Sequence, residues 1–258
     1  MRLAPIITLL TVFVPVFAMA QSPLSGVDLT SPAMTEATMS REEVAQALTQ
    51  ENADLTGARL SGLDLSGMDF RGANLRTARL NNTDLRGSNL DGAVLDQAWL
   101  LSAQLDGASL RGARLFQAQL QQASLRGADL SDTVASADFT KADLTGAIFV
   151  GADLGADLVN QSMGLLRGNL SGATAIGADF TNARLVRTTL NFANLTDSNF
   201  TNADLSTASL AGANLTGARL TGADMTGADV TSATLRDLVA TDPAILAPAH
   251  NMNRAIRD

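Results

Sequence analysis

A strict period of five residues constrains the fold of this chain more than any other feature. Every fifth residue from Leu55 to Leu130 is Leu or Phe, over sixteen consecutive positions, and the residue two places earlier is usually Ala. This period fits neither an α-helix, with about 3.6 residues per turn, nor the two-residue alternation of a β-strand. Each unit is therefore expected to be a short extended piece followed by a corner, and the tandem repetition predicts a solenoid.

Charged residues spaced twenty apart indicate how many repeats make one coil of this solenoid. If coils stack at the spacing of β-strands, about 4.8 Å, residues twenty apart are neighbours in a four-sided coil, and opposite charges there attract. A three-sided coil of fifteen residues would instead place Arg71 on Arg86 and Asp91 on Asp106. The predicted stacks are Arg71, Asp91 and Arg111; Arg86, Asp106 and Arg126; and Arg76 with Asp96. The alternation of sign therefore favours the four-sided coil.

The repeat unit has the form Ala-(Asp/Asn)-Leu-x-x. Residues 53–57 have the sequence ADLTG, residues 58–62 follow with ARLSG, and the pattern extends from about Ala53 to Leu235. This pattern resembles that of the pentapeptide-repeat family. The resemblance implies an all-β fold, a right-handed quadrilateral parallel β-helix in which four pentapeptides form each coil of about twenty residues.

The N-terminal residues 1–20 have the features of a signal peptide. Arg2 supplies a positive charge, residues 3–17 are an apolar stretch, and residues 18–20 form a small-x-small cleavage site. The stretch is shorter than the roughly 20 residues of a membrane-spanning helix, so we expect no transmembrane anchor after cleavage. Export predicts a periplasmic or secreted protein. The sequence has no Cys, so an oxidising compartment would bring no disulfides.

Both ends of the solenoid are expected to be covered, because an open end would expose the apolar core and unpaired backbone groups. Residues 21–39 are rich in Ser, Thr and Pro and predict a flexible leader. A Ser-x-x-Glu pattern predicts a capping helix over residues 40–51. After the last repeat, residues 238–258 predict a C-terminal cap, with one short helix after Asp242 and another opening at Pro248.

The repeats, residues 52–237, contain two breaks in register. One step between core residues is nine instead of ten, near residues 131–138, and one is eleven instead of ten, near residues 155–164. Because the two breaks cancel, we predict one continuous solenoid that regains its phase at Leu165 without an extra loop. In this phase one side of the core holds Phe139, Phe180 and Phe200.

The residues that catalysis or metal binding would need are sparse. His250 is the only His and lies in the tail. Asp residues recur at the position before the core Leu, and in the pentapeptide-repeat family that position has a structural role. No spacing of nucleophile, base or paired carboxylates stands out. We therefore predict no enzyme activity and no catalytic, cofactor-binding or metal-binding residues.

The charge balance disfavours direct binding to nucleic acid. Removal of residues 1–20 takes away one Arg, so 18 − 1 = 17 basic residues remain against 26 acidic ones, a formal net charge of −9. Phosphate recognition needs clustered Lys and Arg, and the only Lys of the chain is Lys141. The acidity mainly favours solubility.

Large apolar residues in outward positions are the candidate binding site. They lie beside core positions of the third and fourth coils, and a solvated face is not expected to collect such side chains. We predict contact with a protein partner or with a second copy of the chain, and the alternative is packing under the leader or tail. A weaker second group is Leu166, Ile176 and Val186. The candidate patch is Val94, Trp99, Leu101 and Phe116.

Three functions are compatible with these observations. The first is an exported, non-enzymatic solenoid that acts as a protein-binding or structural scaffold. The second follows from the resemblance: some acidic members of the family mimic DNA and protect topoisomerases, but the signal peptide disfavours a cytoplasmic target. The third is ice binding by ladders of Thr, although Thr is also a common residue of exposed strands. An enzyme that uses the irregular middle is a further, weaker alternative.

Overall fold

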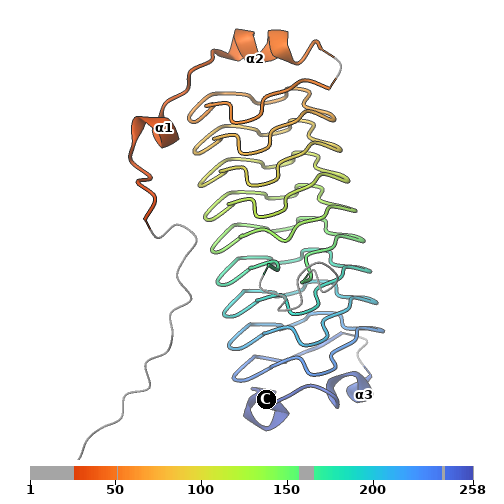
Figure 1. Cartoon of the computed structure of the whole chain (residues 1–258). Coiled ribbons are helices and arrows are strands. Elements are labelled where there is room, and N and C mark those ends of the chain that lie inside the picture. Colours follow the sequence, from red (N-terminus) through yellow and green to blue (C-terminus); the bar gives the residue numbers. More distant parts are fainter. Residues whose placement is uncertain (1–25, 51, 157–165, 240–241, 258) are drawn as a thin grey trace, which may run out of the picture.

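The structure is a computed structural model and describes residues 26–50, 52–156, 166–239 and 242–257. The chain forms a straight rod of stacked coils, with short helical segments at its ends and along one flank (Figure 1). No helix in these described ranges is long and apolar enough to cross a membrane. The helices are α1 (Pro32–Thr35), α2 (Arg41–Ala47), α3 (Pro243–Leu246) and the 3-10 helix η1 (Met252–Arg254).

The coils are held together by parallel bridges between residues that are, for most of the rod, twenty positions apart. Each coil has four sides, and each side carries one bridge residue instead of a longer strand. The period of twenty predicted from the charges is thus the period of the backbone. We name the sides by their first bridge residues: side A starts at Asp54, side B at Arg59, side C at Asp64 and side D at Asp69.

Backbone hydrogen bonds explain both the corner and the stacking. The N–H of Leu55 donates to the carbonyl of Asn74 in the next coil at 2.8 Å, and the N–H of Ala58 donates back to Leu55 at 3.0 Å to close the corner. The middle residue of the corner is left-handed, with φ of 66° at Gly57. Gly tolerates this conformation without steric cost, which is why it recurs there.

Leu and Ala alternate toward the interior and fill the rod from end to end. On side D the rings of Phe149, Phe180 and Phe200 stack at 5.0 Å between neighbouring centroids. The prediction that Phe139 belongs to this stack is wrong. Phe139 lies behind side B, where its neighbour Asp138 bridges Asn169, and its ring meets Phe149 edge-on at 6.1 Å.

The two breaks in register do not cancel. From Gln119 to its bridge partner Asp138 is 138 − 119 = 19 residues, so the first break is a deletion of one residue. From Asp138 to Asn169 is 169 − 138 = 31 residues, so the second is an insertion of eleven. The predicted return at Leu165 without an extra loop is therefore wrong. Leu165 lies outside the described residues, and the core resumes at Leu170.

The first coil is covered by α2. Its N-terminus has the predicted capping box, in which the Ser40 hydroxyl accepts from the Glu43 N–H and the Glu43 carboxylate accepts from the Ser40 N–H. Val44 is fully buried in the end of the core. Arg41 donates to the carbonyls of Asp64 and Ser66. The helix is shorter than the predicted range of 40–51.

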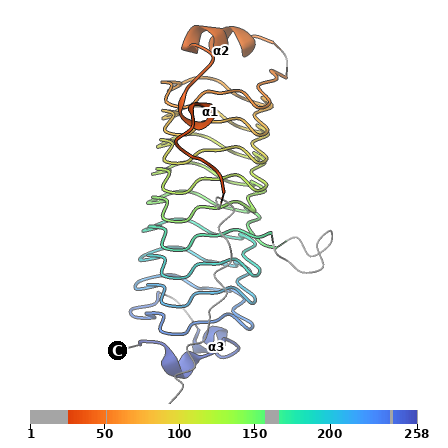
Figure 2. The same ribbon diagram turned by 60° about the vertical axis from the view of Figure 1, so that its left-hand side comes forward.

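Residues 26–39 differ from the predicted flexible leader, because they lie along the flank of the first coils (Figure 2). Within this leader Met34 is buried, at 5% exposure. The Asn81 side-chain amide donates to the Met34 carbonyl at 3.0 Å, and the Thr38 N–H donates to the Arg59 carbonyl at 2.9 Å. The Ser, Thr and Pro content that predicted flexibility does not prevent docking, since most contacts involve the leader's backbone.

The C-terminal residues continue the stacking before the chain ends. Arg219 bridges Val239, Asp229 bridges His250, and the apolar side chains of the tail pack against the last coil. The Asp242 carboxylate accepts from the Ala244 N–H at 2.8 Å and caps α3 as the sequence indicates. The second helix, η1, begins at Met252 and not at Pro248. Residues 1–20, the predicted signal peptide, lie outside the described residues.

The predicted charge stacks are present, but most of their carboxylates contact backbone groups. Arg76 pairs with Asp96 across twenty residues at 3.4 Å. Asp91 instead accepts from the Arg111 N–H at 3.0 Å, and the Arg111 guanidinium pairs with Asp129 at 2.8 Å. The residues are therefore neighbours as expected, but Arg71 and Arg86 pair with Asp69 and Asp84 of their own corners, whereas Arg111 and Arg126 pair diagonally with the adjacent coil.

Candidate functional site

Bridge residues that are Asp or Asn commonly stabilise their own corner. The Asp179 carboxylate, on side D, accepts from the Thr181 N–H at 2.9 Å and from the Thr181 hydroxyl at 2.5 Å. A short Asp or Asn side chain that accepts from the N–H two residues later forms an Asx turn. The same contacts from Thr56 hold the pKa of the Asp54 carboxyl below its usual value. The recurrent Asp residues therefore have a structural reason, as predicted.

Side B departs from this pattern over its first four coils. Its bridge residues there are Arg59, Arg79, Trp99 and Gln119, none of which is a short side chain that accepts from its own corner. Asx turns return on this side from the fifth coil onward, at Asp138, Asn169 and Asp229. The side chains of the early coils are consequently available for contacts across the surface.

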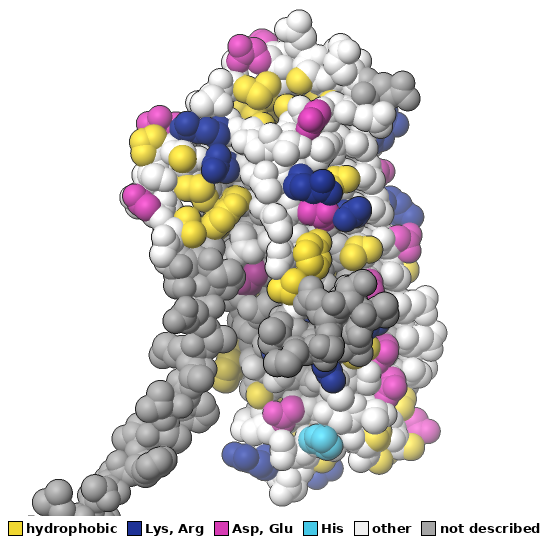
Figure 3. All heavy atoms as spheres, in the orientation of Figure 1, with side chains coloured by type: hydrophobic (Ala, Val, Ile, Leu, Met, Phe, Trp, Pro, Cys, Tyr) yellow, Lys and Arg dark blue, Asp and Glu magenta, His cyan; other side chains and the backbone are white. Residues whose placement is uncertain are grey.

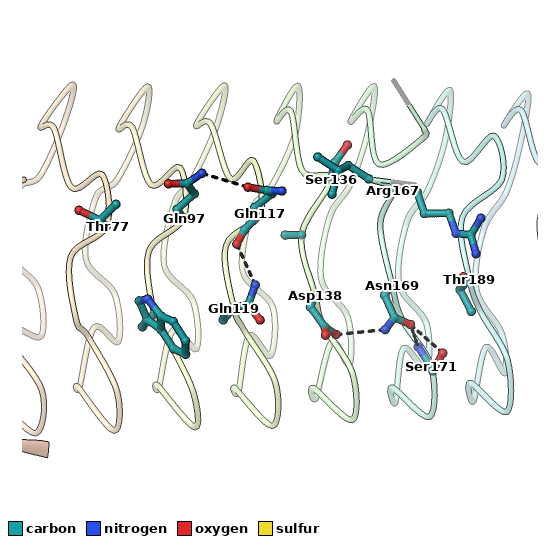
Figure 4. A pocket seen from close by; sticks show the side chains of 13 residues that line it. Thr77, Gln97, Gln117, Gln119, Ser136, Asp138, Arg167, Asn169, Ser171 and Thr189 are labelled. Atoms are coloured by element: carbon teal, nitrogen blue, oxygen red, sulfur yellow. Dashed lines mark hydrogen bonds between the residues drawn. The ribbon is translucent and has the colours of Figure 1, made fainter. Parts of the chain in front are cut away.

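A groove of about 690 Å³ runs along side B over successive coils (Figure 4). Hydrophobic side chains gather at mid-height of this flank of the rod, and a second group lies on the leader (Figure 3). The groove is lined by Thr77, Gln97, Trp99, Gln117, Gln119, Ser136, Ala137, Asp138, Leu166, Arg167, Asn169, Ser171 and Thr189.

Side-chain amides and one carboxylate form a hydrogen-bonded row in the groove. Gln97 donates to the Gln117 side-chain oxygen at 3.0 Å, and Gln119 donates to the Gln117 carbonyl at 2.8 Å. Gln121 donates from one nitrogen to Gln119 and to Asp138, at 2.9 and 2.8 Å. These bonds hold the amides in place. Gln119 and Gln121 are buried, whereas Gln97 and Gln117 are at least partly exposed and keep further hydrogen-bonding capacity for a ligand.

Of the four residues of the predicted patch, only Trp99 lines the groove. Val94 is a bridge residue of side A, and Phe116 lies on the corner between sides A and B. Leu101 lies on the corner between sides B and C, where its N–H donates to Asn81 at 3.1 Å. All four side chains are partly buried. The patch thus occupies the adjacent sides A and B of the third and fourth coils, together with the two corners that flank side B.

Sequence reasoning missed most of the groove. Gln97 and Gln117 are twenty residues apart, so their pairing could have been found with the twenty-residue spacing that was applied to the charges. The position of Arg167 in the groove could not have been found in this way, because Arg167 follows the eleven-residue insertion. Leu166, from the weaker second group, does line the groove. Phe192 was also missed: it is 75% exposed at a left-handed corner, with φ of 58°, and its ring lies beside Gly212.

The Thr ladders serve the corners. The Thr201 hydroxyl donates to Asn199 at 2.6 Å, as Thr181 does to Asp179, and the Asn199 amide donates to the Thr181 hydroxyl at 2.8 Å. Hydroxyls engaged in this way satisfy one another and the backbone. This arrangement gives the ladders a structural role and does not favour the ice-binding alternative.

The described residues contain no group of three or more His, Cys, Asp or Glu that could hold a metal ion. His250 is a bridge residue of the C-terminal cap, paired with Asp229. The neighbouring Asn251 amide donates to the Asp229 carboxylate at 2.8 Å. His250 is therefore part of the end of the solenoid.

The fold and groove define a class: a four-sided parallel β-helix built from tandem five-residue repeats. The model of the pentapeptide repeats family matches the chain in eight copies, over residues 51–87, 78–115, 108–158, 169–202 and 198–237. The chain belongs to the pentapeptide repeat family, whose fold is a right-handed β-helix. The resemblance seen in the sequence is confirmed.

Solved structures of the family resemble the chain over most of its length. HetL, a pentapeptide repeat protein involved in heterocyst differentiation regulation from the cyanobacterium Nostoc sp. strain PCC 7120, is 29% identical, with a TM-score of 0.35 and coverage of 82% of this chain and 92% of HetL. A trypsin-treated variant of QnrB1, a plasmid-mediated fluoroquinolone resistance protein, is 18% identical, with a TM-score of 0.40 and coverage of 78% and 89%.

A pentapeptide repeat protein from the Arabidopsis thaliana thylakoid lumen is 30% identical, with a TM-score of 0.11 and coverage of 69% of this chain and 72% of that one. A search of curated proteins finds no match. At these TM-scores the superpositions carry no functional argument, and the repeat match establishes the family.

Proposed function

We propose that the chain is an exported, non-enzymatic scaffold that binds a protein partner through the groove on side B. The observation that carries this proposal is the partly exposed Trp99 in a groove of about 690 Å³. Trp is enriched at the centres of protein interfaces, where it supplies a large apolar surface and a hydrogen-bond donor. Around it the amides of Gln97, Gln117 and Gln119 provide polar contacts that fix orientation.

Two features support a scaffold over the alternatives. Backbone hydrogen bonds join neighbouring coils along every side, so the rod presents a rigid array of side chains. The signal-like residues 1–20 favour a periplasmic or secreted location, away from a cytoplasmic topoisomerase. No arrangement of the described residues favours the DNA-mimicking alternative specifically.

The proposal is tested by crosslinking and affinity capture with the mature protein from the envelope fraction of the producing cell, where N-terminal sequencing is expected to give Gln21. Trp99→Asp places a charge in the groove and is expected to abolish capture of the partner. Phe192→Asp is the matched control, because it removes an aromatic side chain that is 75% exposed and lies outside the groove.

The expected result is one set of crosslinked proteins that wild type and Phe192→Asp share and Trp99→Asp lacks. Circular dichroism of the three proteins checks that the fold is unchanged. Identical captured sets for all three would refute the proposal, as would a protein found with Met1 intact in the cytoplasm.

A further inference from the structure

The leader shows how side B holds a polypeptide. The Arg59 guanidinium donates to the carbonyl of Pro32 and, at 3.3 Å, to that of Glu36. With the bonds from Asn81 to the Met34 carbonyl and from Thr38 to the Arg59 carbonyl, each of these contacts uses the leader's main chain. One apolar side chain, Met34, is buried as an anchor. The leader thus docks on this side through main-chain groups and one buried apolar anchor.

The groove continues the same side directly beyond the leader. The leader contacts Arg59 and Asn81, in the first and second coils, and the groove lining begins at Thr77 and Trp99, in the second and third. Both surfaces combine long donor side chains with a place for an apolar anchor. Asn81 also joins them, since its side-chain oxygen accepts from the Leu101 N–H in the coil that holds Trp99.

The backbone of the rod cannot add a further strand on this side. The N–H of Leu100 donates to Gln119 and the N–H of Gln119 donates to Ala98, so neighbouring coils already pair these groups. A bound chain would also rise about 3.3 Å per residue against a coil spacing of about 4.8 Å, and would not keep a fixed register with the coils. Recognition must come from side chains, and the at least partly exposed amides of Gln97 and Gln117 have spare hydrogen-bonding capacity for it.

We infer that the groove binds an extended segment of the partner polypeptide, lying along the rod as the leader does, with backbone groups on the Gln amides and one apolar side chain on Trp99. This inference rests on the proposed function and specifies the form of the partner. It differs from docking of a folded surface, because affinity would depend on the backbone of a short segment and on one anchor residue.

The test uses random peptides displayed on phage and selected on the full-length mature protein. The selected peptides are synthesised, and their dissociation constants are measured by fluorescence polarisation. Trp99→Ala is expected to weaken binding at least about tenfold and Gln117→Ala several-fold, whereas Phe192→Ala leaves binding unchanged. Within a peptide, N-methylation of the backbone is expected to weaken binding at several positions, and Ala substitution only at the anchor.

Gln117→Ala keeps the test valid if Trp99→Ala fails to fold, because Gln117 is an outward residue of a corner. Peptides whose dissociation constants are unchanged by both Trp99→Ala and Gln117→Ala would overturn the inference. If Trp99-dependent capture of a protein partner then persisted, the partner would dock as a folded surface and the proposed function would stand. If the wild-type protein showed no Trp99-dependent capture of a partner either, both the inference and the proposed function would fail.

Discussion

Sides B and D are built from the same repeat, and their bridge residues have different tasks. On side D, Asp129, Asp179 and Asn199 each accept from the N–H two residues later and close their own corner. On side B, Trp99 and Gln119 close no corner with their side chains and face the groove. The comparison separates side chains that the fold needs to close its corners from side chains that are available to bind a partner.

This difference follows from the solenoid itself. Because stacked coils pair one another's N–H and C=O groups, the backbone offers few contacts to a ligand along the sides. Binding must then reside where a bridge residue is not needed for the turn. Side B meets this condition in the early coils, and the leader already occupies its first part through Arg59 and Asn81.

The largest predicted effect lies in the core behind side D. Phe180 is fully buried between Phe149 and Phe200, so Phe180→Ala leaves a cavity and removes two ring contacts. We expect the free energy of unfolding to fall by about 3–5 kcal/mol, measured by urea denaturation. Behind side B, Leu190 takes the place that Phe180 has behind side D. The groove on side B should therefore be unaffected by Phe180→Ala.

Phe180→Leu is the matched control, because Leu occupies the same position in other coils, as at Leu90 and Leu110. Phe180→Leu is expected to lower the free energy of unfolding by clearly less than Phe180→Ala does. Equal losses for the two variants would show that the stacking of rings, and not the filled volume, stabilises this part of the rod.

The corners offer a smaller effect that tests the comparison directly. Asp179→Ala on side D removes the acceptor for the Thr181 N–H, the Thr181 hydroxyl and the Asn199 amide. We expect a loss of about 1–2 kcal/mol in the free energy of unfolding. On side B, Thr189→Ala is expected to change it by less than about 0.5 kcal/mol. Similar losses from both urea titrations would contradict the division of tasks between the sides.

The fold could be predicted from the sequence because the repeat is a local rule that every coil obeys. The period of five predicted the corners, and opposite charges twenty residues apart, such as Arg76 and Asp96, predicted the four sides of each coil. The break at 155–164 could not be sized, because an inserted segment follows no repeat and Leu165 matched the pattern by coincidence of spacing. The stack that was predicted to contain Phe139 failed for the same reason.

The candidate site was predictable only in part. Trp99 was found because it is apolar in an outward position, but a groove also depends on which corners face one another, and that is set by the stacking. Gln97 and Gln117 carry no individual signal as polar surface residues. The leader's docking depends on backbone carbonyls, and backbone contacts leave little trace in side-chain composition.

The smallest predicted effect concerns the charge of a single corner on side D. The Arg71 guanidinium donates to both oxygens of Asp69, at 2.9 and 2.6 Å, and the Arg71 N–H adds a further bond. These contacts hold the pKa of the Asp69 carboxyl below its usual value. A carboxyl with a lowered pKa in the folded state stabilises the fold above its unfolded pKa, about 3.9, and loses this contribution as the pH falls through the folded pKa.

Asp69→Asn keeps one acceptor oxygen for the Arg71 N–H and removes the charge together with the second acceptor of the Arg71 guanidinium. The variant is expected to be slightly less stable than wild type at about pH 7 and to lose less stability on acidification to about pH 3, because one titrating group is gone. Urea midpoints of both proteins across this range measure the difference. Because Asp69 is exposed and its ion pair is screened by solvent, the two curves should converge by only a small amount. Curves that stay parallel down to the acid limit would show that this corner of side D is held by hydrogen-bond geometry alone.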